Sequence, residues 1–97
     1  MSVVTTREIA NALNLDETEV QQQAMMAWLT EQKRRILQTR LEILARYRSA
    51  SLEELEAKIA DGEVPEHPAW EDLIVAENLS NRLEEINAYL RRLQSAG

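Results

Sequence analysis

Apolar residues recur every three or four positions along most of the chain, which is the spacing of one face of an α-helix. The longest such series runs from Glu17 to about Ser49 and contains no glycine or proline. It predicts a helix over residues 17–49, about 50 Å long at a rise of 1.5 Å per residue. A second series is spaced 4, 3, 4 and 3 residues apart, as in the seam of a coiled coil: Leu79, Leu83, Ile86, Leu90 and Leu93. It predicts a C-terminal helix over residues 69–93.

Capping residues mark the helix starts in the first part of the chain. Thr5 or Thr6 is placed to cap a short helix that begins near Arg7, and Asp16 is placed to cap the long helix. The six residues at the N-terminus are rich in β-branched types. They form either a short strand that pairs with a second copy of the chain or a frayed end.

A third helix is predicted between the two long ones. Ser51 and Glu54 have the spacing of a capping box, and Gly62 fits the left-handed position that ends a helix. So few glycines and prolines argue against an all-β fold, which needs frequent turns. The sequence therefore predicts an all-α fold of about four helices in a single helical domain spanning residues 1–97.

The length of the predicted rod bears on association. A helix of about 50 Å overhangs a compact domain of this size, whose radius of gyration would be about 13 Å. Its apolar stripe is too long for the shorter helices of the same chain to cover, and a bare stripe would be an unusually large exposed patch. We therefore predict a homodimer whose interface, with self or with a partner, involves Val20, Leu29, Ile36, Leu37, Leu41, Leu44, Trp70, Leu79, Leu83, Ile86, Leu90 and Leu93. The competing monomer has a break near residues 32–35, where no helix-breaking residue stands.

The chain carries few residues that support catalysis. It has no cysteine, two glycines and a single histidine, so disulfides, thiolate metal sites and glycine-rich phosphate loops are excluded. We expect His67, which lies near Glu66 and Glu71, to cap a helix or pack on Trp70 rather than act as a base or metal ligand. We predict no enzyme activity and no cofactor or metal. Because no apolar run approaches 18 residues, we also expect no membrane span and a cytoplasmic protein.

Charge is divided unevenly between the two halves. Residues 1–48 hold seven Lys/Arg and six Asp/Glu, whereas residues 49–97 hold four and eleven. Residues 50–97 are thus interpreted as an acidic helical hairpin that either binds a partner or presents ordinary solvated helix faces. Residues 1–30 fit a helix-turn-helix or a ribbon-helix-helix segment for dimerisation or DNA binding. The candidate contacts to nucleic acid or to an acidic partner are Arg7, Lys33, Arg34, Arg35 and Arg40, and the alternative is that these are ordinary solvated side chains.

The most distinctive string is Pro65-Glu-His-Pro-Ala-Trp-Glu-Asp-Leu73. Its prolines stiffen the entry to the last helix, and Trp70 is either core beneath that corner or an anchor in a partner's pocket. Through residues 43–47, 51–59 and 63–73, the chain resembles, over nearly its whole length, a family of short, mostly uncharacterised prokaryotic helical proteins.

The first half of the chain also resembles the opening of antitoxins from toxin–antitoxin pairs. This resemblance implies that residues 1–30 dimerise or bind operator DNA and that residues 50–97 face a toxin-like protein. We therefore expect an antitoxin-like interaction protein. The alternatives are a structural or adaptor homo-oligomer without a toxin and a small DNA-binding transcription regulator.

Overall fold

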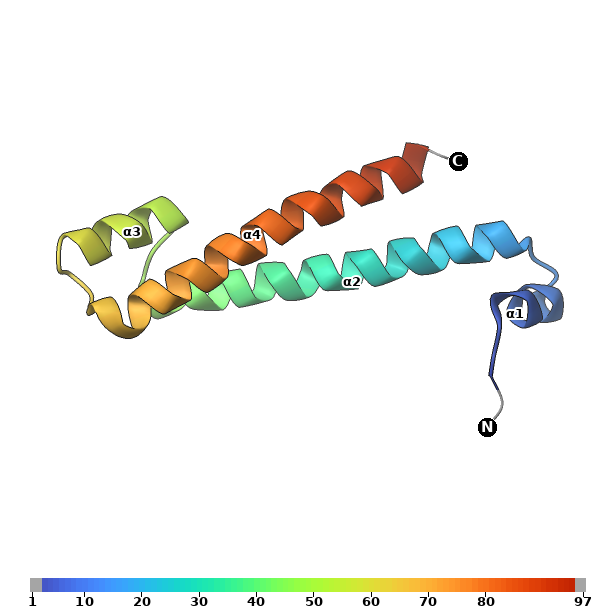
Figure 1. Ribbon diagram of the computed structural model, residues 1–97, viewed down its shortest axis with the longest axis horizontal. Helices are drawn as coiled ribbons and strands as arrows, with labels where there is room; N and C mark the ends of the chain where they lie inside the picture. The colour runs from blue at the N-terminus through green and yellow to red at the C-terminus, as the bar shows by residue number, and fades with distance from the viewer. Residues whose placement is uncertain (1–2, 96–97) are drawn as a thin grey trace.

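The computed structural model describes residues 3–95, which form four α-helices and no strand. The helices are α1 (Thr6–Leu13), α2 (Glu17–Arg46), α3 (Leu52–Ala60) and α4 (Glu66–Ser95). The two long helices lie side by side and antiparallel, α3 packs at the end where the chain turns back, and α1 lies at the opposite end (Figure 1). The predicted all-α fold of about four helices is confirmed.

Local capping explains where α1 and α2 begin and where α1 ends. The hydroxyl of Thr5 accepts a hydrogen bond from the Glu8 amide at 3.1 Å, and the carboxylate of Asp16 accepts one from the Thr18 amide at 2.7 Å. Asn14 ends α1 in the left-handed conformation, with φ 56°. The predicted N-terminal strand is absent from residues 3–5, and residues 1–2 lie outside the described range.

The Ser51 capping box forms with one difference from the expected pattern. The Ser51 hydroxyl accepts from the Glu54 amide at 3.1 Å, but the Glu54 carboxylate accepts from the amide of Ala50 rather than from that of Ser51. Gly62 follows α3 with φ 75°, in the left-handed region that glycine adopts without steric cost. The capping signals therefore located α3 correctly.

The long helix α2 is continuous, so the alternative with a break at residues 32–35 is wrong. It ends at Arg46, three residues before the predicted boundary, because Tyr47 leaves helical geometry and Arg48 takes φ 51°. The last helix is longer than predicted. Its backbone departs from helical values at His67, which precedes a cis bond to Pro68.

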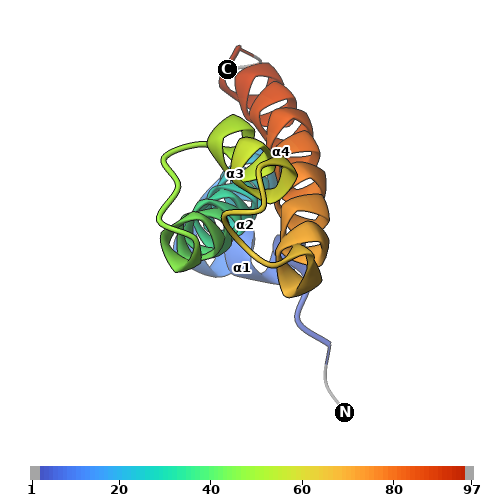
Figure 2. The same cartoon turned by 90° about the vertical axis from the view of Figure 1, so that its left-hand side faces the viewer.

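The main hydrophobic core lies at the closed end of the hairpin, where α3 meets the long helices. It consists of buried Ile43, Leu55, Ile59, Ala69, Leu73 and Ala76. Leu55 and Leu73 are the largest fully buried side chains, and the small side chains of Ala69 and Ala76 let the helices approach closely. Seen from this end, α3 lies against the α2–α4 pair as a third helix (Figure 2). Outside this cluster only Ala10, Ile36 and Ile86 are buried apolar residues in the described part of the chain.

The molecule is elongated, at 60 × 35 × 16 Å, with a radius of gyration of 19.4 Å against about 13 Å for a compact chain of this length. We predicted that shorter helices of the same chain would leave the α2 stripe largely bare. This needs correction, because α4 is as long as α2, at 30 residues each, and packs along it. Within residues 3–95, no helix has both the length and the hydrophobicity that crossing a membrane requires.

Candidate interaction surfaces

The open half of the hairpin carries an apolar groove between the two long helices. Its lining comes from α2 and α4, and we call it the Trp28 groove: Ala24, Met25, Trp28, Leu29, Tyr89 and Leu93. The α2 residues recur at one-turn spacing, as do the two α4 residues, so each helix presents one face to the groove. The groove encloses about 580 Å³ and has no charged lining residue.

The side chains of the Trp28 groove are unusually exposed for their type. Trp28 is 62% exposed, Tyr89 is 54% exposed and Met25 is 47% exposed. The guanidinium of Arg92 lies 5.5 Å from the centre of the Tyr89 ring, which places a cation at the rim. These residues remain open to solvent because α3 packs only at the closed end.

The interface residues predicted from the sequence fall into three groups within the single chain. Ile36 and Ile86 are buried, whereas Leu37, Leu41 and Trp70 are exposed. Those of intermediate burial are Val20, Leu29, Leu44, Leu79, Leu83, Leu90 and Leu93. Much of the leucine seam is thus covered by packing within one chain, and the exposed remainder is divided among separate patches.

Sequence reasoning missed the most exposed members of the groove. Met25, Trp28 and Tyr89 are all absent from the interface predicted from the sequence. The available signal was that Trp28 lies four residues after Ala24 and one before Leu29, on the flank of the stripe. Only the three-dimensional pairing of α2 with α4 places Trp28 and Tyr89 in one groove.

The predicted basic residues do not form one stripe. Arg34 and Arg35 both bind the carboxylate of Glu31, at 2.7 and 3.2 Å. These bonds, first from Arg34 and then from Arg35, lower the pKa of Glu31 to about 2. Because Lys33, Arg34 and Arg35 are consecutive, they point about 100° apart around the helix and cannot all face one ligand.

The two remaining candidate cations are also engaged within the chain. Arg7 lies 3.6 Å from the carboxylate of Glu17, and Arg40 donates to the hydroxyl of Ser80 at 3.3 Å. The Arg40 bond links α2 to α4 near the middle of the hairpin. These contacts reduce the cationic surface that a phosphate backbone would meet.

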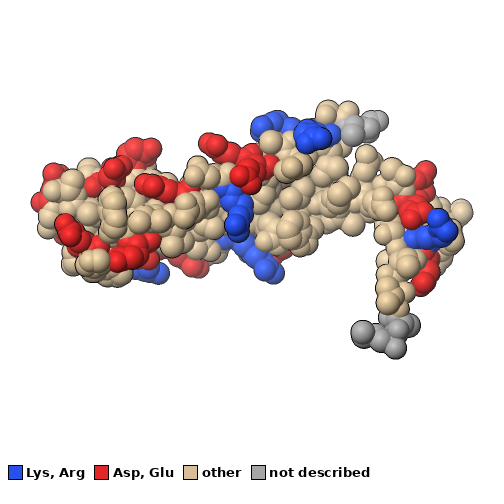
Figure 3. Space-filling model, viewed as in Figure 1, with Lys and Arg blue, Asp and Glu red and all other residues tan. Residues whose placement is uncertain are grey.

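The closed end of the hairpin is strongly acidic. Residues 51–77 hold nine Asp/Glu and one lysine, a balance of −8. Carboxylates crowd the α3 end of the molecule, while cations lie mainly toward its centre and open end (Figure 3). The predicted acidic half is therefore acidic chiefly around α3 and the start of α4.

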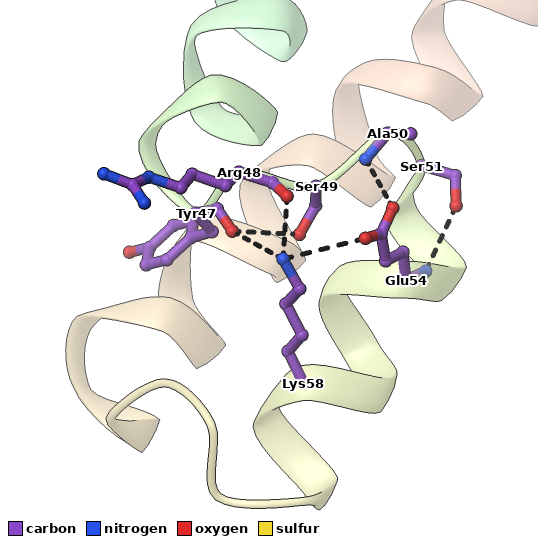
Figure 4. A network of polar contacts seen from close by, with 7 residues as sticks. All are labelled: Tyr47, Arg48, Ser49, Ala50, Ser51, Glu54 and Lys58. Carbon is purple, nitrogen blue, oxygen red and sulfur yellow. Dashed lines mark hydrogen bonds and ion pairs between the residues drawn. The ribbon is translucent and has the colours of Figure 1, made fainter.

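Lys58, the lysine of this segment, is held against the end of α2. Its ammonium donates to the carbonyls of Tyr47 at 3.1 Å and Arg48 at 2.7 Å, and it lies 3.6 Å from the carboxylate of Glu54 (Figure 4). Carbonyls at a helix C-terminus carry partial negative charge, so a cation there stabilises the turn. Lys58 consequently contributes little to the outward charge of the closed end.

A second polar contact ties α2 to α4 at the closed end. Asp72 accepts hydrogen bonds from the guanidinium of Arg46, at 2.8 Å, and from the hydroxyl of Tyr47. Burial and the hydrogen bond to Asp72 raise the pKa of Tyr47, while the same carboxylate raises the pKa of Arg46. The arrangement has the geometry of a structural clamp between the helix ends.

The proline-rich corner forms a smaller groove, which we call the Trp70 groove. It encloses about 400 Å³ between α3 and the start of α4, lined by Glu56, Ile59, Ala60, Glu66, His67 and Trp70. His67 places Nδ1 2.5 Å from the Glu71 carboxylate. A backbone hydrogen bond and then the contact with His67 lower the pKa of Glu71. Trp70 is 48% exposed, so its side chain is neither fully buried in the core nor fully open to solvent.

Comparison with known proteins places the chain by sequence only. A family model described as the Uncharacterized protein MJ0235 family matches residues 1–97. No curated protein and no solved structure matches the chain.

Proposed function

We propose that this chain, which belongs to the MJ0235 family, is a non-enzymatic interaction protein that forms a homodimer through the Trp28 groove. The observation that carries the proposal is the uncharged, exposed groove on the open half of the hairpin. Contiguous apolar surface of this kind marks a site of association. A second copy is the occupant we favour, because the lining of an identical groove is also uncharged and can cover this one without burying a charged lining residue.

The exposed area of the chain supports this occupant. A compact monomer of 11.1 kDa would expose about 5,700 Å². This chain exposes 7312 Å², an excess of roughly 1,600 Å² over that expectation. A stable interface buries about 800 Å² per partner, so the excess is ample for a dimer. Four of the six groove residues belong to α2, in keeping with dimerisation through the long helix.

Light scattering coupled to size-exclusion chromatography tests the proposal. We expect wild-type protein at twice the 11.1 kDa chain mass. Trp28→Glu should return it to the chain mass, because the carboxylate would be buried without a partner. Thr30→Glu, which adds the same charge about 200° away around the helix, should remain dimeric. Helical circular dichroism should be retained in both variants, since Trp28 is largely exposed within one chain.

Two results would overturn this assignment. One is a wild-type protein that stays monomeric at high concentration. The other is a dimer that survives Trp28→Glu but dissociates with Leu41→Glu, a matched change at another exposed apolar residue of α2. That pattern would place the interface elsewhere on the long helix.

We further propose that the acidic closed end covers a basic partner protein, in an antitoxin-like role. Its support is the balance of −8 over residues 51–77, with the sole lysine held against α2. Co-expression with the product of the adjacent gene tests this role, and we expect the two proteins to co-purify. If only the homodimer is recovered, the antitoxin-like role is wrong, and the alternative of a structural or adaptor homo-oligomer without a toxin replaces it.

The DNA-binding alternative has less support. Of the five candidate cations, Arg7, Arg34 and Arg35 are paired with carboxylates and Arg40 binds Ser80. Fluorescence anisotropy with duplex DNA at low salt would detect phosphate-driven binding, which is strongest under those conditions. We expect no binding, and saturable binding would favour a transcription regulator.

A further inference from the structure

The Trp70 groove combines three chemical features in one small space. Ile59 and Ala60 of α3 supply apolar surface, and Trp70 of α4 supplies a half-exposed indole ring. Glu56 comes from α3 and Glu66 from the start of α4, so both helices contribute a carboxylate. A groove built this way is suited to a side chain that is apolar along its stem and cationic at its tip.

The two carboxylates that line the groove have no cationic partner among the described residues of the chain. Among residues 3–95, no Lys or Arg lies within ion-pair distance of Glu56 or Glu66. Lys58 is engaged by Tyr47, Arg48 and Glu54 at the end of α2. The histidine in the lining is directed to Glu71. The nearby charge therefore repels phosphates and attracts basic groups.

We propose that the Trp70 groove binds an arginine side chain presented by a basic segment of a partner protein. The guanidinium stacks on the indole of Trp70 and donates to the carboxylates of Glu56 and Glu66. Arginine suits this combination better than lysine, because its planar group is weakly hydrated, stacks on aromatic faces and donates along several directions. The inference rests on the proposed partner role of the acidic end and names the contact that would provide it.

The occupant is a different protein rather than a second copy of this chain. The Trp28 groove involves residues 24–29 and 89–93 at the open half, whereas the Trp70 groove involves residues 56–70 at the closed end. In the 60 Å long molecule, the first groove lies between α2 and α4 on the open half of the hairpin, and the second lies between α3 and the start of α4 at the closed end. A dimer built on the first groove therefore does not require the second.

Binding of a fluorescein-labelled hexa-arginine peptide tests the proposal by anisotropy at physiological salt. We expect Glu56→Gln/Glu66→Gln to weaken binding by about tenfold or more, and Trp70→Leu to weaken it similarly. The matched control is Glu84→Gln/Glu85→Gln, which removes the same charge from exposed positions outside the groove. It should change the affinity by less than about threefold, the part due to general electrostatics.

Tryptophan fluorescence gives a second readout at the groove itself. In a Trp28→Phe background, Trp70 is the one remaining tryptophan, and its emission should shift as hexa-arginine binds. Hexalysine should bind more weakly and shift the emission less. The proposal would be overturned by equal losses of affinity in the two double variants, by unchanged affinity in Trp70→Leu, or by Trp70 emission that does not shift in the Trp28→Phe protein.

Failure of this inference can be separated from failure of the proposed function. If the adjacent gene's product co-purifies equally with wild type, Trp70→Leu and Glu56→Gln/Glu66→Gln, the partner role stands and the arginine contact is wrong. If hexa-arginine binding requires the groove residues but no partner co-purifies, the contact stands and the antitoxin-like role is wrong. Light scattering on Trp70→Leu and on Glu56→Gln/Glu66→Gln, both made in the chain that retains Trp28, should give the dimer mass, because neither variant alters the Trp28 groove.

Discussion

Lys58 lies where α2 ends and α3 begins, with its ammonium on two backbone carbonyls. No amide of a following helical turn donates to these carbonyls, because the helix has ended. The ammonium of Lys58 instead donates charge-assisted hydrogen bonds to them. The Lys58 side chain is only 20% exposed, which limits replacement by water. The conformation of residues 47–51 therefore depends on a residue from the following helix.

We expect Lys58→Met to lower the free energy of unfolding by about 1–2 kcal/mol, because the stem is retained while the bonds to the carbonyls are lost. Urea denaturation at fixed protein concentration measures this change. Lys33→Met is the control, since Lys33 has no ion pair within the described residues, and it should change the stability by less than about 0.5 kcal/mol. Equal losses in both variants would contradict the role given to Lys58.

Glu31 provides a prediction about pH. Hydrogen bonds from Arg34 and Arg35 lower its pKa from 4.5 to about 2. A carboxylate whose pKa is lowered on folding stabilises the fold above its ordinary pKa, and this contribution is lost as the pH falls toward the lowered value. NMR titration of the Glu31 carboxyl carbon should give a midpoint near 2, and Arg34→Gln should move the midpoint toward 4.5. A wild-type midpoint near 4.5 would show that these exposed ion pairs do not persist in solution.

At the scale of helices, the starts of α1, α2 and α3 could be predicted from the sequence because they depend on local chemistry. Thr5, Asp16 and Ser51 each accept the expected backbone hydrogen bond. The end of α2 was less accurate, because Arg48 adopts φ 51° with no glycine or proline to mark it. A local turn closes the helix, in which the Ser49 amide donates to the Leu44 carbonyl at 2.9 Å and the Arg48 amide donates to the Ala45 carbonyl at 3.1 Å. The bonds from Lys58 of α3 add to this turn, and the sequence pattern does not report them.

The pairing of helices was harder to predict than their positions. Periodicity identifies the apolar face of a helix that is expected to be buried, but it does not identify the element that packs against this face. The C-terminal leucine seam was equally compatible with packing inside one chain and between two. The antiparallel pairing of α2 with α4 settles part of this question, and the same pairing brings Trp28 beside Tyr89.

A substitution at Leu73 measures how much the packing of α3 contributes to the free energy of unfolding. Leu73 is 1% exposed and belongs to the cluster that joins α3 to the long helices, whereas the adjacent Ile74 is 43% exposed. Leu73→Ala should cost about 3 kcal/mol, because it leaves a cavity in this cluster. Ile74→Ala removes a similar apolar volume and should cost less than about 1 kcal/mol. Chemical denaturation compares them, and equal losses would show that the closed end is not the main core.

At the scale of the whole molecule, the two ends of the hairpin differ in how completely they are packed. The closed end has three helices around a buried cluster and an acidic surface. The open end has two long helices with exposed aromatic side chains, and α1 packs against α2 there. The closed end thus has a buried core within one chain, whereas the open end would gain most from the proposed second copy.

This division predicts how thermal stability depends on concentration. If two copies cover the Trp28 groove, dissociation accompanies unfolding, and the Tm of the wild-type protein should rise with protein concentration. Trp28→Glu should melt at a lower Tm that does not change with protein concentration, because the variant is monomeric and no dissociation accompanies its unfolding. Leu73→Ala should also melt earlier but keep the concentration dependence, since its cavity lies away from the groove. Differential scanning calorimetry over a hundredfold range of concentration separates these cases. A concentration-independent wild-type Tm would mean that the exposed aromatic groove is tolerated in a monomer, and the excess of exposed surface would then need a different partner.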